Sequence, residues 1–217
     1  ILCLHGYRQD SNLFREKSGG LRKLLKNVVD FVFVDAPHLV PLGEQNPDAD
    51  SQFRSWWFSE RSESNVNSFY SGKHSDICIG FDESLKVIDE ACAMQGPFDG
   101  ILGFSQGAAM VALICTMIRD GTFRHSFKFA VFFAAFESLN SHHESLYSKK
   151  INIPSLHVIG ETDKVIVKER SVKLSECFEC PSLLFHKGGH CVPSSSQNKT
   201  TFLEFFDKFR DVSNGTD

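Results

Sequence analysis

The residues Gly103-Phe104-Ser105-Gln106-Gly107 form a Gly-x-Ser-x-Gly pattern, which is typical of a nucleophilic serine. An apolar stretch precedes the pattern and a helix-like stretch rich in small residues follows it, which is the strand–turn–helix context that the motif requires. Side chains at the two glycine positions would collide with the strand and the helix, and the helix dipole favours negative charge at the serine. The pattern predicts a nucleophile at Ser105, with an ordinary surface turn as the alternative.

A serine alcohol needs a base to act as a nucleophile, and the base needs an acid to orient it. His190 follows two glycines directly after the last apolar stretch, so it is expected at the carboxyl edge of the sheet, where open α/β folds place their sites. Asp163 lies in a loop after an earlier strand, which gives the order serine, acid, histidine. We predict Ser105, Asp163 and His190 as the catalytic residues, with Glu161 as the alternative acid.

Two backbone N–H groups are needed to stabilise a developing oxyanion. One is expected from Gln106, the residue after the nucleophile. The other is expected from Tyr7, in the loop after the first strand, where Gly6 allows close approach of the backbone. His5 is predicted to hold this loop rather than to act as a second base, and Arg8 is either a surface residue or a pocket residue.

These residues must be positioned by alternating strands and helices, which indicate a parallel sheet with crossover helices. Strands are predicted at Ile1–Leu4, Phe31–Asp35, Gly100–Phe104, Phe127–Phe133, Ser155–Ile159 and Leu183–His186. Helices are predicted at Asn12–Lys26, Ile79–Met94, Gln106–Arg119, Val167–Cys177 and Asn198–Phe209. The predicted fold is a three-layer, doubly wound α/β domain spanning residues 1–217. Its sheet has six mostly parallel strands in the order 2-1-3-4-5-6.

Residues 37–76 interrupt this alternation with a long polar stretch that nevertheless carries several aromatic residues. Long loops in compact domains are usually functional or disordered, and the aromatic residues argue against disorder. We interpret the segment as a pocket wall or lid, with Trp56, Trp57, Phe58 and Phe104 as candidate pocket residues. The alternative is a loop that two tryptophans fix to the body of the protein.

Composition excludes several classes of protein. Lys plus Arg is 23 and Asp plus Glu is 27, so the net charge is −4 and no basic excess indicates a nucleic-acid partner. No apolar run reaches the roughly 18 residues of a membrane span, so no stable membrane insertion is expected. Seven scattered cysteines indicate a reducing compartment, and we expect a cytoplasmic protein. Because the chain begins at Ile1, inside an apolar strand, we expect further residues before it, where a targeting segment would change this expectation.

The pair Cys177 and Cys180, followed by His186 and His190, superficially imitates a zinc finger. The gap from Cys180 to His186 is too short for that pattern, which needs about twelve intervening residues. A redox role is also disfavoured, because the cysteine pair follows a helix rather than beginning one. No dinucleotide-binding or Walker sequence is present, so we expect neither a metal nor an organic cofactor.

The chain resembles the family serine hydrolase group of α/β-hydrolases over nearly its whole length. The resemblance rests on Leu4-His5-Gly6-Tyr7-Arg8-Gln9, Arg15-Glu16-Lys17, Trp56-Trp57-Phe58-Ser59-Glu60, Gly96-Pro97-Phe98-Asp99-Gly100, Gly103–Gly107 and Gly160–Ile166. It implies a single-domain cytosolic serine esterase without a cofactor, whose triad maps onto Ser105, Asp163 and His190. It also implies alkyl esters with fairly long acyl chains as substrates.

These observations together predict a serine carboxylesterase that hydrolyses small-molecule acyl esters through an acyl-enzyme on Ser105. The same triad would serve an acyl thioesterase equally well. A hydrolase fold that binds an apolar ligand or a protein without catalysis is the alternative outside enzymes. The sequence predicts no oligomeric state.

Overall fold

The computed structural model describes residues 1–40, 52–193 and 198–210, and its centre is a sheet of six parallel strands. The strands are β1 (Leu2–Leu4), β2 (Val32–Val34), β7 (Gly100–Phe104), β8 (Phe129–Phe133), β9 (Ser155–Gly160) and β10 (Pro181–His186). They lie in the order β2-β1-β7-β8-β9-β10, and every neighbouring pair is parallel. Four short strands within the described residues lie outside this sheet. When only the sheet strands are counted, the order is the predicted 2-1-3-4-5-6.

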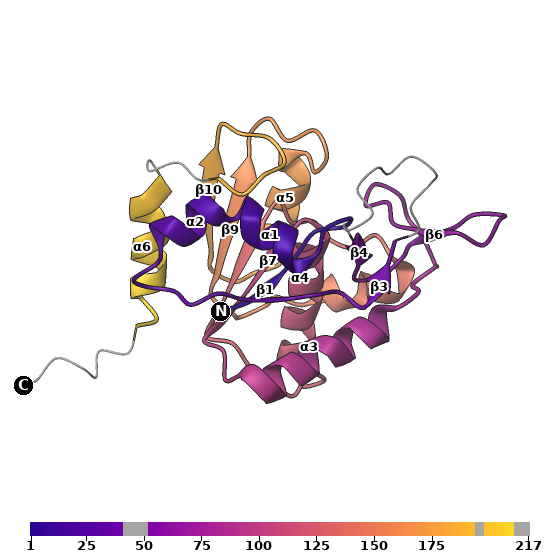
Figure 1. Cartoon of the computed structure of the whole chain (residues 1–217), viewed down its shortest axis with the longest axis horizontal. Coiled ribbons are helices and arrows are strands. Elements are labelled where there is room, and N and C mark those ends of the chain that lie inside the picture. The colour runs from indigo at the N-terminus through magenta and orange to yellow at the C-terminus, as the bar shows by residue number, and fades with distance from the viewer. Residues whose placement is uncertain (41–51, 194–197, 211–217) are drawn as a thin grey trace, which may run out of the picture.

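Helices cover both faces of the sheet, as Figure 1 shows. Successive strand residues point to opposite faces, so that Leu2 and Leu4 join one core while Cys3 joins the other. The first core lies against α3 (Phe81–Gln95), α4 (Gln106–Arg119) and α5 (Lys168–Ser175). The second lies against α1 (Ser11–Lys17), α2 (Gly19–Leu24) and α6 (Lys199–Asp207). This is the predicted three-layer α/β class.

The prediction of a single helix at Asn12–Lys26 is wrong, because the structure has two helices there, α1 and α2, which are separated at Ser18. The Ser18 hydroxyl donates to the carbonyl oxygens of Phe14 (2.8 Å) and Arg15 (3.2 Å). A serine that bonds to preceding carbonyls competes with the helical ladder, and the following Gly19-Gly20 pair favours helix weakly.

The helix predicted at Gln106–Arg119 has those bounds in the structure, and the other three predicted helices are present with shifted ends. The helix predicted to begin at Ile79 begins at Phe81, because Gly80 adopts a left-handed conformation with φ of 87° as its N-cap. A Cβ at Gly80 would lie 2.2 Å from the His38 imidazole, so only glycine fits there. A 3₁₀ helix at Ser141–Ser148 was not predicted, although Asn140 caps its start by accepting from the His142 amide.

The part of segment 37–76 that the structure describes contains two short antiparallel pairs. These are β3 (His38–Leu39) with β4 (Arg54–Ser55), and β5 (Glu60–Arg61) with β6 (Asn67–Ser68). Residues 41–51 of the segment lie outside the described residues. Trp56 and Trp57 are 0% and 1% exposed and pack in the first core, so they do not line an open pocket. Their burial favours the alternative reading of a loop that two tryptophans fix in place.

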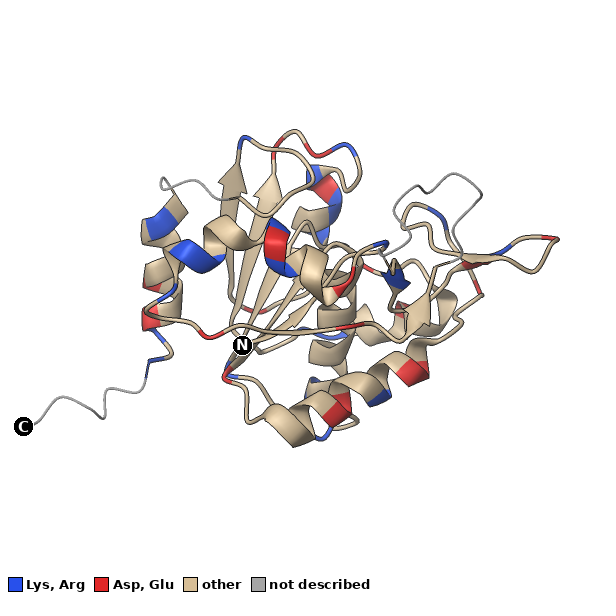
Figure 2. Ribbon diagram, viewed as in Figure 1, with Lys and Arg blue, Asp and Glu red and all other residues tan. Residues whose placement is uncertain are grey.

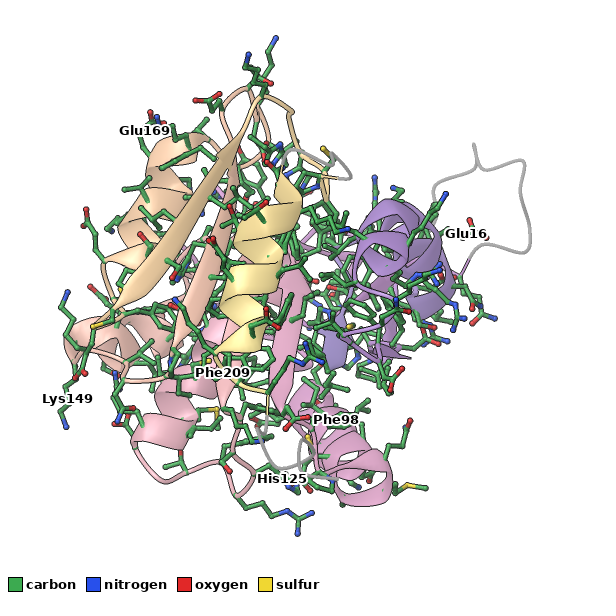
Figure 3. All side chains as sticks on the ribbon, turned by 90° about the vertical axis from the view of Figure 1, so that its left-hand side faces the viewer. Glu16, Phe98, His125, Lys149, Glu169 and Phe209 are labelled. Atoms are coloured by element: carbon green, nitrogen blue, oxygen red, sulfur yellow. The ribbon has the colours of Figure 1, made fainter. Side chains whose placement is uncertain are left out.

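Lys, Arg, Asp and Glu residues lie on the helices, the loops and the short strands β4 and β5, whereas the strands of the central sheet carry none, as Figure 2 shows. Figure 3 shows labelled charged residues such as Lys149 and Glu169 at the periphery, pointing away from the ribbon. Within the described part of the chain, no helix is long and apolar enough to cross a membrane.

Candidate active site

The Gly-x-Ser-x-Gly pattern forms a sharp turn between β7 and α4. Ser105 has φ of 53° and ψ of −116°, a strained conformation for a residue with a side chain. A Cβ at Gly103 would lie 2.5 Å from Ala108 Cα, and one at Gly107 would lie 2.3 Å from the Leu4 carbonyl oxygen. Both glycines are therefore required by close backbone approach, as the sequence pattern indicated.

The structure brings Ser105, His190 and Asp163 together in one hydrogen-bonded chain. The Ser105 hydroxyl lies 3.0 Å from His190 Nε2, and His190 Nδ1 lies 2.7 Å from Asp163 Oδ2. Because a carboxylate faces Nδ1, that nitrogen carries the proton and Nε2 is free to accept from the serine. The Asp163 side chain is 1% exposed and the His190 side chain 21%, so the imidazole is partly accessible while the carboxylate is buried.

The Asp163 carboxylate is fixed by its own loop. Its Oδ1 accepts hydrogen bonds from the backbone amides of Val165 (2.8 Å) and Ile166 (2.9 Å), which leaves Oδ2 directed at the imidazole. Glu161, the alternative acid, is exposed, and its amide donates to the His186 carbonyl. The geometry therefore selects Asp163 over Glu161 as the partner of the histidine.

The loops that carry Asp163 and His190 touch through a glycine. A Cβ at Gly160, at the end of β9, would lie 2.5 Å from the carbonyl oxygen of Gly189, next to His190. The absence of a side chain at Gly160 therefore lets the histidine loop come close to the acid loop. The site therefore requires a glycine at position 160, although this residue has no side chain that could take part in a reaction.

Phe104 supports the imidazole rather than lining an open pocket, which corrects its prediction as a pocket residue. Its ring centroid lies 4.8 Å from that of His190 and 6.0 Å from that of Phe14, and the side chain is buried. Phe58 is also buried, and its backbone pairs with that of Ile79. Neither residue has the exposure of a pocket wall.

His5 has the structural role predicted for it. Its Nε2 accepts from the Ala36 amide at 3.0 Å, so Nδ1 carries the proton and donates to the Gly6 carbonyl at 2.8 Å. Burial lowers the pKa of His5 to about 4, so the imidazole is neutral at physiological pH. It ties the loop after β1 to the chain after β2. Arg8, left open by the sequence, is exposed.

The two amides predicted to bind an oxyanion are both available. Within the part of the chain that the structure describes, neither the Tyr7 amide nor the Gln106 amide has a hydrogen-bond partner. The Gln106 amide is the first of α4, where backbone N–H groups are unpaired. A Cβ at Gly107 would lie 2.4 Å from the His5 carbonyl, so the start of α4 lies against the loop that carries Tyr7.

The side chain of Gln106 is a feature that sequence reasoning missed. It is fully buried and bonds to the backbone of Trp56 and Trp57, about 50 residues earlier in the chain. No local pattern predicts such a contact. Among the described residues, no group of three or more His, Cys, Asp or Glu side chains could hold a metal ion.

Comparison with known proteins identifies a family and several relatives of this chain. Residues 1–202 match the sequence model of the FSH1 serine hydrolase family. The chain is 45% identical to "Esterase OVCA2" of Xenopus tropicalis, over 96% of this chain and 92% of that protein. It is 39% identical to "Esterase OVCA2" of Homo sapiens, over 96% of each.

Solved structures share the fold at low sequence identity. Esterase PE8 has a TM-score of 0.62 at 19% identity, covering 96% of this chain and 91% of that one. SOBER1 of Arabidopsis thaliana has a TM-score of 0.60 at 17% identity, covering 96% and 97%. The family match and the full-length relatives lead to one conclusion: the chain is an enzyme that belongs to the FSH1 serine hydrolase family.

Proposed function

We propose that this enzyme hydrolyses carboxylic esters with Ser105 as nucleophile, His190 as general base and Asp163 as the acid that orients it. The observation that carries the proposal is the continuous hydrogen-bonded chain from the Ser105 hydroxyl through His190 to Asp163, with distances of 3.0 and 2.7 Å. The curated relatives named as esterases support the choice of an ester substrate.

In the first half of the reaction, the Ser105 oxygen attacks the acyl carbon while its proton passes to His190 Nε2. The carbonyl oxygen becomes an oxyanion, which the amides of Tyr7 and Gln106 hold. The imidazolium then donates its proton to the leaving alcohol, and an acyl-enzyme remains on Ser105. In the second half, water gives a proton to His190 and attacks the acyl carbon. The imidazolium then returns that proton to the Ser105 oxygen as the bond to the acyl group breaks, which releases the acid and restores the serine.

The substrates we propose are esters with medium to long acyl chains. Two large side chains next to residues of the site are exposed, namely Tyr70 at 58% and Val165 at 62%. Val165 lies two residues after Asp163, and Tyr70 follows Phe69, whose ring lies 5.5 Å from that of Tyr7. These surfaces suit a hydrocarbon chain better than a charged acyl group.

We further propose that residues 1–217 work as one α/β-hydrolase domain in the cytoplasm. One sheet carries the loops of the nucleophile, the acid and the base, which supports a single domain. All seven cysteines are free thiols, which fits a reducing compartment. Among the described residues of segment 37–76, we propose Phe69, whose ring contacts that of Tyr7, and the exposed Tyr70 as a wall of the site.

Turnover of matched substrates tests this function. The experiment compares wild-type protein and Ser105→Ala on a chain-length series of alkyl esters and on the thioesters of the same acids. We expect faster hydrolysis of the longer oxygen esters and a loss of at least about 10⁴-fold in kcat in the variant. Preference for the thioesters would make the enzyme a thioesterase. Equal rates for wild type and variant would overturn the proposed nucleophile.

A further inference from the structure

The Gln106 side chain lies behind the nucleophile turn, in the buried space between α4 and the segment Arg54–Trp57. Its Oε1 accepts from the Trp56 amide at 3.0 Å, and its Nε2 donates to the Trp57 carbonyl at 2.8 Å. Both of its polar atoms also lie within 3.3 Å of the Ser55 hydroxyl. Both polar atoms of the Gln106 side chain thus form hydrogen bonds with one short stretch of chain.

The same segment, Arg54–Trp57, holds the loop that carries the other oxyanion amide. The Arg8 amide donates to the Arg54 carbonyl at 3.0 Å, and the Arg54 amide donates to the Gln9 carbonyl at 3.0 Å. The Trp56 indole donates to the His5 carbonyl at 2.8 Å. These bonds fix the chain on both sides of Tyr7, one residue after it and two residues before it.

We propose that the Gln106 side chain is a positioning residue that sets the separation of the two oxyanion donors. It links its own backbone amide to the Tyr7 amide through segment Arg54–Trp57. The inference rests on the proposed function, because it assigns a role only if these two amides bind an oxyanion. The segment then serves the reaction without touching substrate, which gives the buried Trp56 and its neighbours a role that the pocket interpretation missed.

Two local features support a positioning role over simple burial of a polar group. A buried glutamine needs partners for its amide, but any carbonyl and N–H groups would satisfy it. Here the partners lie on the segment that bonds to the Tyr7 loop, where Arg8 holds a positive φ of 58°. A strained residue beside an unpaired amide persists only where the surroundings hold it, and Arg54 provides that restraint.

The main test replaces Gln106 with Met, which keeps the length of the side chain and removes its hydrogen bonds. We expect kcat for a short ester to fall by about 10- to 100-fold, because misplaced oxyanion donors cost rates of this order. We expect KM to change less than about threefold, since the neutral ester does not yet carry the oxyanion. The affinity for a trifluoromethyl ketone, whose serine adduct carries that oxyanion, should fall by the same factor as kcat.

Thr116→Val is the matched control. Thr116 is a fully buried residue of the same helix whose hydroxyl donates to the Leu113 carbonyl, near the end of α4 away from Ser105. The variant loses a buried hydrogen bond, but among the described residues Thr116 makes no hydrogen bond to segment Arg54–Trp57. We expect its kcat and inhibitor affinity to stay within twofold of wild type, whatever its thermal stability.

Trp56→Phe keeps the proposal testable if Gln106→Met fails to fold. It removes the indole bond to the His5 carbonyl and shortens a buried ring that contacts the His5 imidazole, while leaving the Gln106 bonds in place. We expect a smaller loss of kcat, about 3- to 10-fold, again without a change in KM. An unchanged kcat in a folded variant of either kind would overturn the proposal, as would an equal loss in Thr116→Val. A wild-type protein without ester turnover would instead overturn the proposed function and the inference with it.

Discussion

Replacing Asp163 with Asn separates the orienting role of this side chain from its role in holding the loop. The amide oxygen of an asparagine retains the bonds from the Val165 and Ile166 amides, whereas its NH₂ group faces His190 Nδ1. The imidazole must then accept at Nδ1 and carry its proton on Nε2, so it no longer accepts the proton of Ser105. In a serine protease this tautomer error lowers kcat by about 10⁴-fold, and we expect a loss of the same order here.

The stability of two Asp163 variants tests whether this side chain holds its loop through the Val165 and Ile166 amides. The free energy of unfolding of Asp163→Asn should lie within about 1 kcal/mol of the wild-type value, because both loop amides keep their acceptor. Asp163→Ala leaves those two amides without a partner at about 1–2 kcal/mol each, so the free energy of unfolding falls by about 2–4 kcal/mol. At about 2–4 °C per kcal/mol, that is a fall in Tm of roughly 4–16 °C.

The assay is steady-state hydrolysis of a p-nitrophenyl ester, with thermal unfolding followed on the same samples. Glu161→Gln is the matched control, because it neutralises an exposed acid two residues away in the same loop. We expect its kcat to stay within twofold of wild type. A folded Asp163→Asn protein that retains more than a tenth of wild-type kcat would refute the assignment, as would a large loss in Glu161→Gln.

Two further predictions concern the histidine loop and the buried histidines. Gly160→Ala places a Cβ 2.5 Å from the Gly189 carbonyl, so we expect about a 10²-fold loss in kcat, whereas Gly189→Ala, whose Cβ meets nothing closer than 3.5 Å, should be tolerated. Comparable activity in the two alanine variants would contradict this. Burial lowers the pKa of His5 and His143 to about 4 and of His157 to about 3, against about 6.5 when unfolded. Between pH 6.5 and 4 the unfolded chain therefore binds more protons than the folded chain. The free energy of unfolding, highest with respect to these groups above pH 6.5, falls as the pH falls toward 4. At pH 5 each of these histidines lowers the free energy of unfolding by about 2 kcal/mol. In His157→Phe, the free energy of unfolding measured with urea should therefore fall less between pH 7 and 5 than in the wild type. An unchanged slope would contradict this account.

The sheet and the catalytic candidates could be predicted from the sequence because both depend on local patterns. The apolar strands alternate with helices, and each candidate of the triad lies just after a strand. Parallel strands end at one edge of the sheet, so Ser105, Asp163 and His190 are brought together by topology alone. The glycines on both sides of Ser105 also indicated a sharp turn at the serine, because a side chain at Gly103 or Gly107 would collide with the neighbouring backbone.

The contacts between distant segments could not be predicted in the same way. Aromatic residues at Trp56, Trp57 and Phe104 indicate burial or a pocket equally well, and only the tertiary structure shows that they are buried. The bonds from the Gln106 side chain join residues about 50 positions apart, which no periodicity encodes. The break at Ser18 was missed because the apolar spacing of a helix continues through it.

The most direct test of the central claim is covalent labelling of the intact wild-type protein with a fluorophosphonate, followed by mapping of the adduct by mass spectrometry. Such reagents require an activated serine and an oxyanion site. We predict one adduct per chain, located on Ser105 and absent from Ser105→Ala. Labelling at another residue, or no labelling of a folded sample, would contradict the assignment of Ser105, His190 and Asp163 as the catalytic residues.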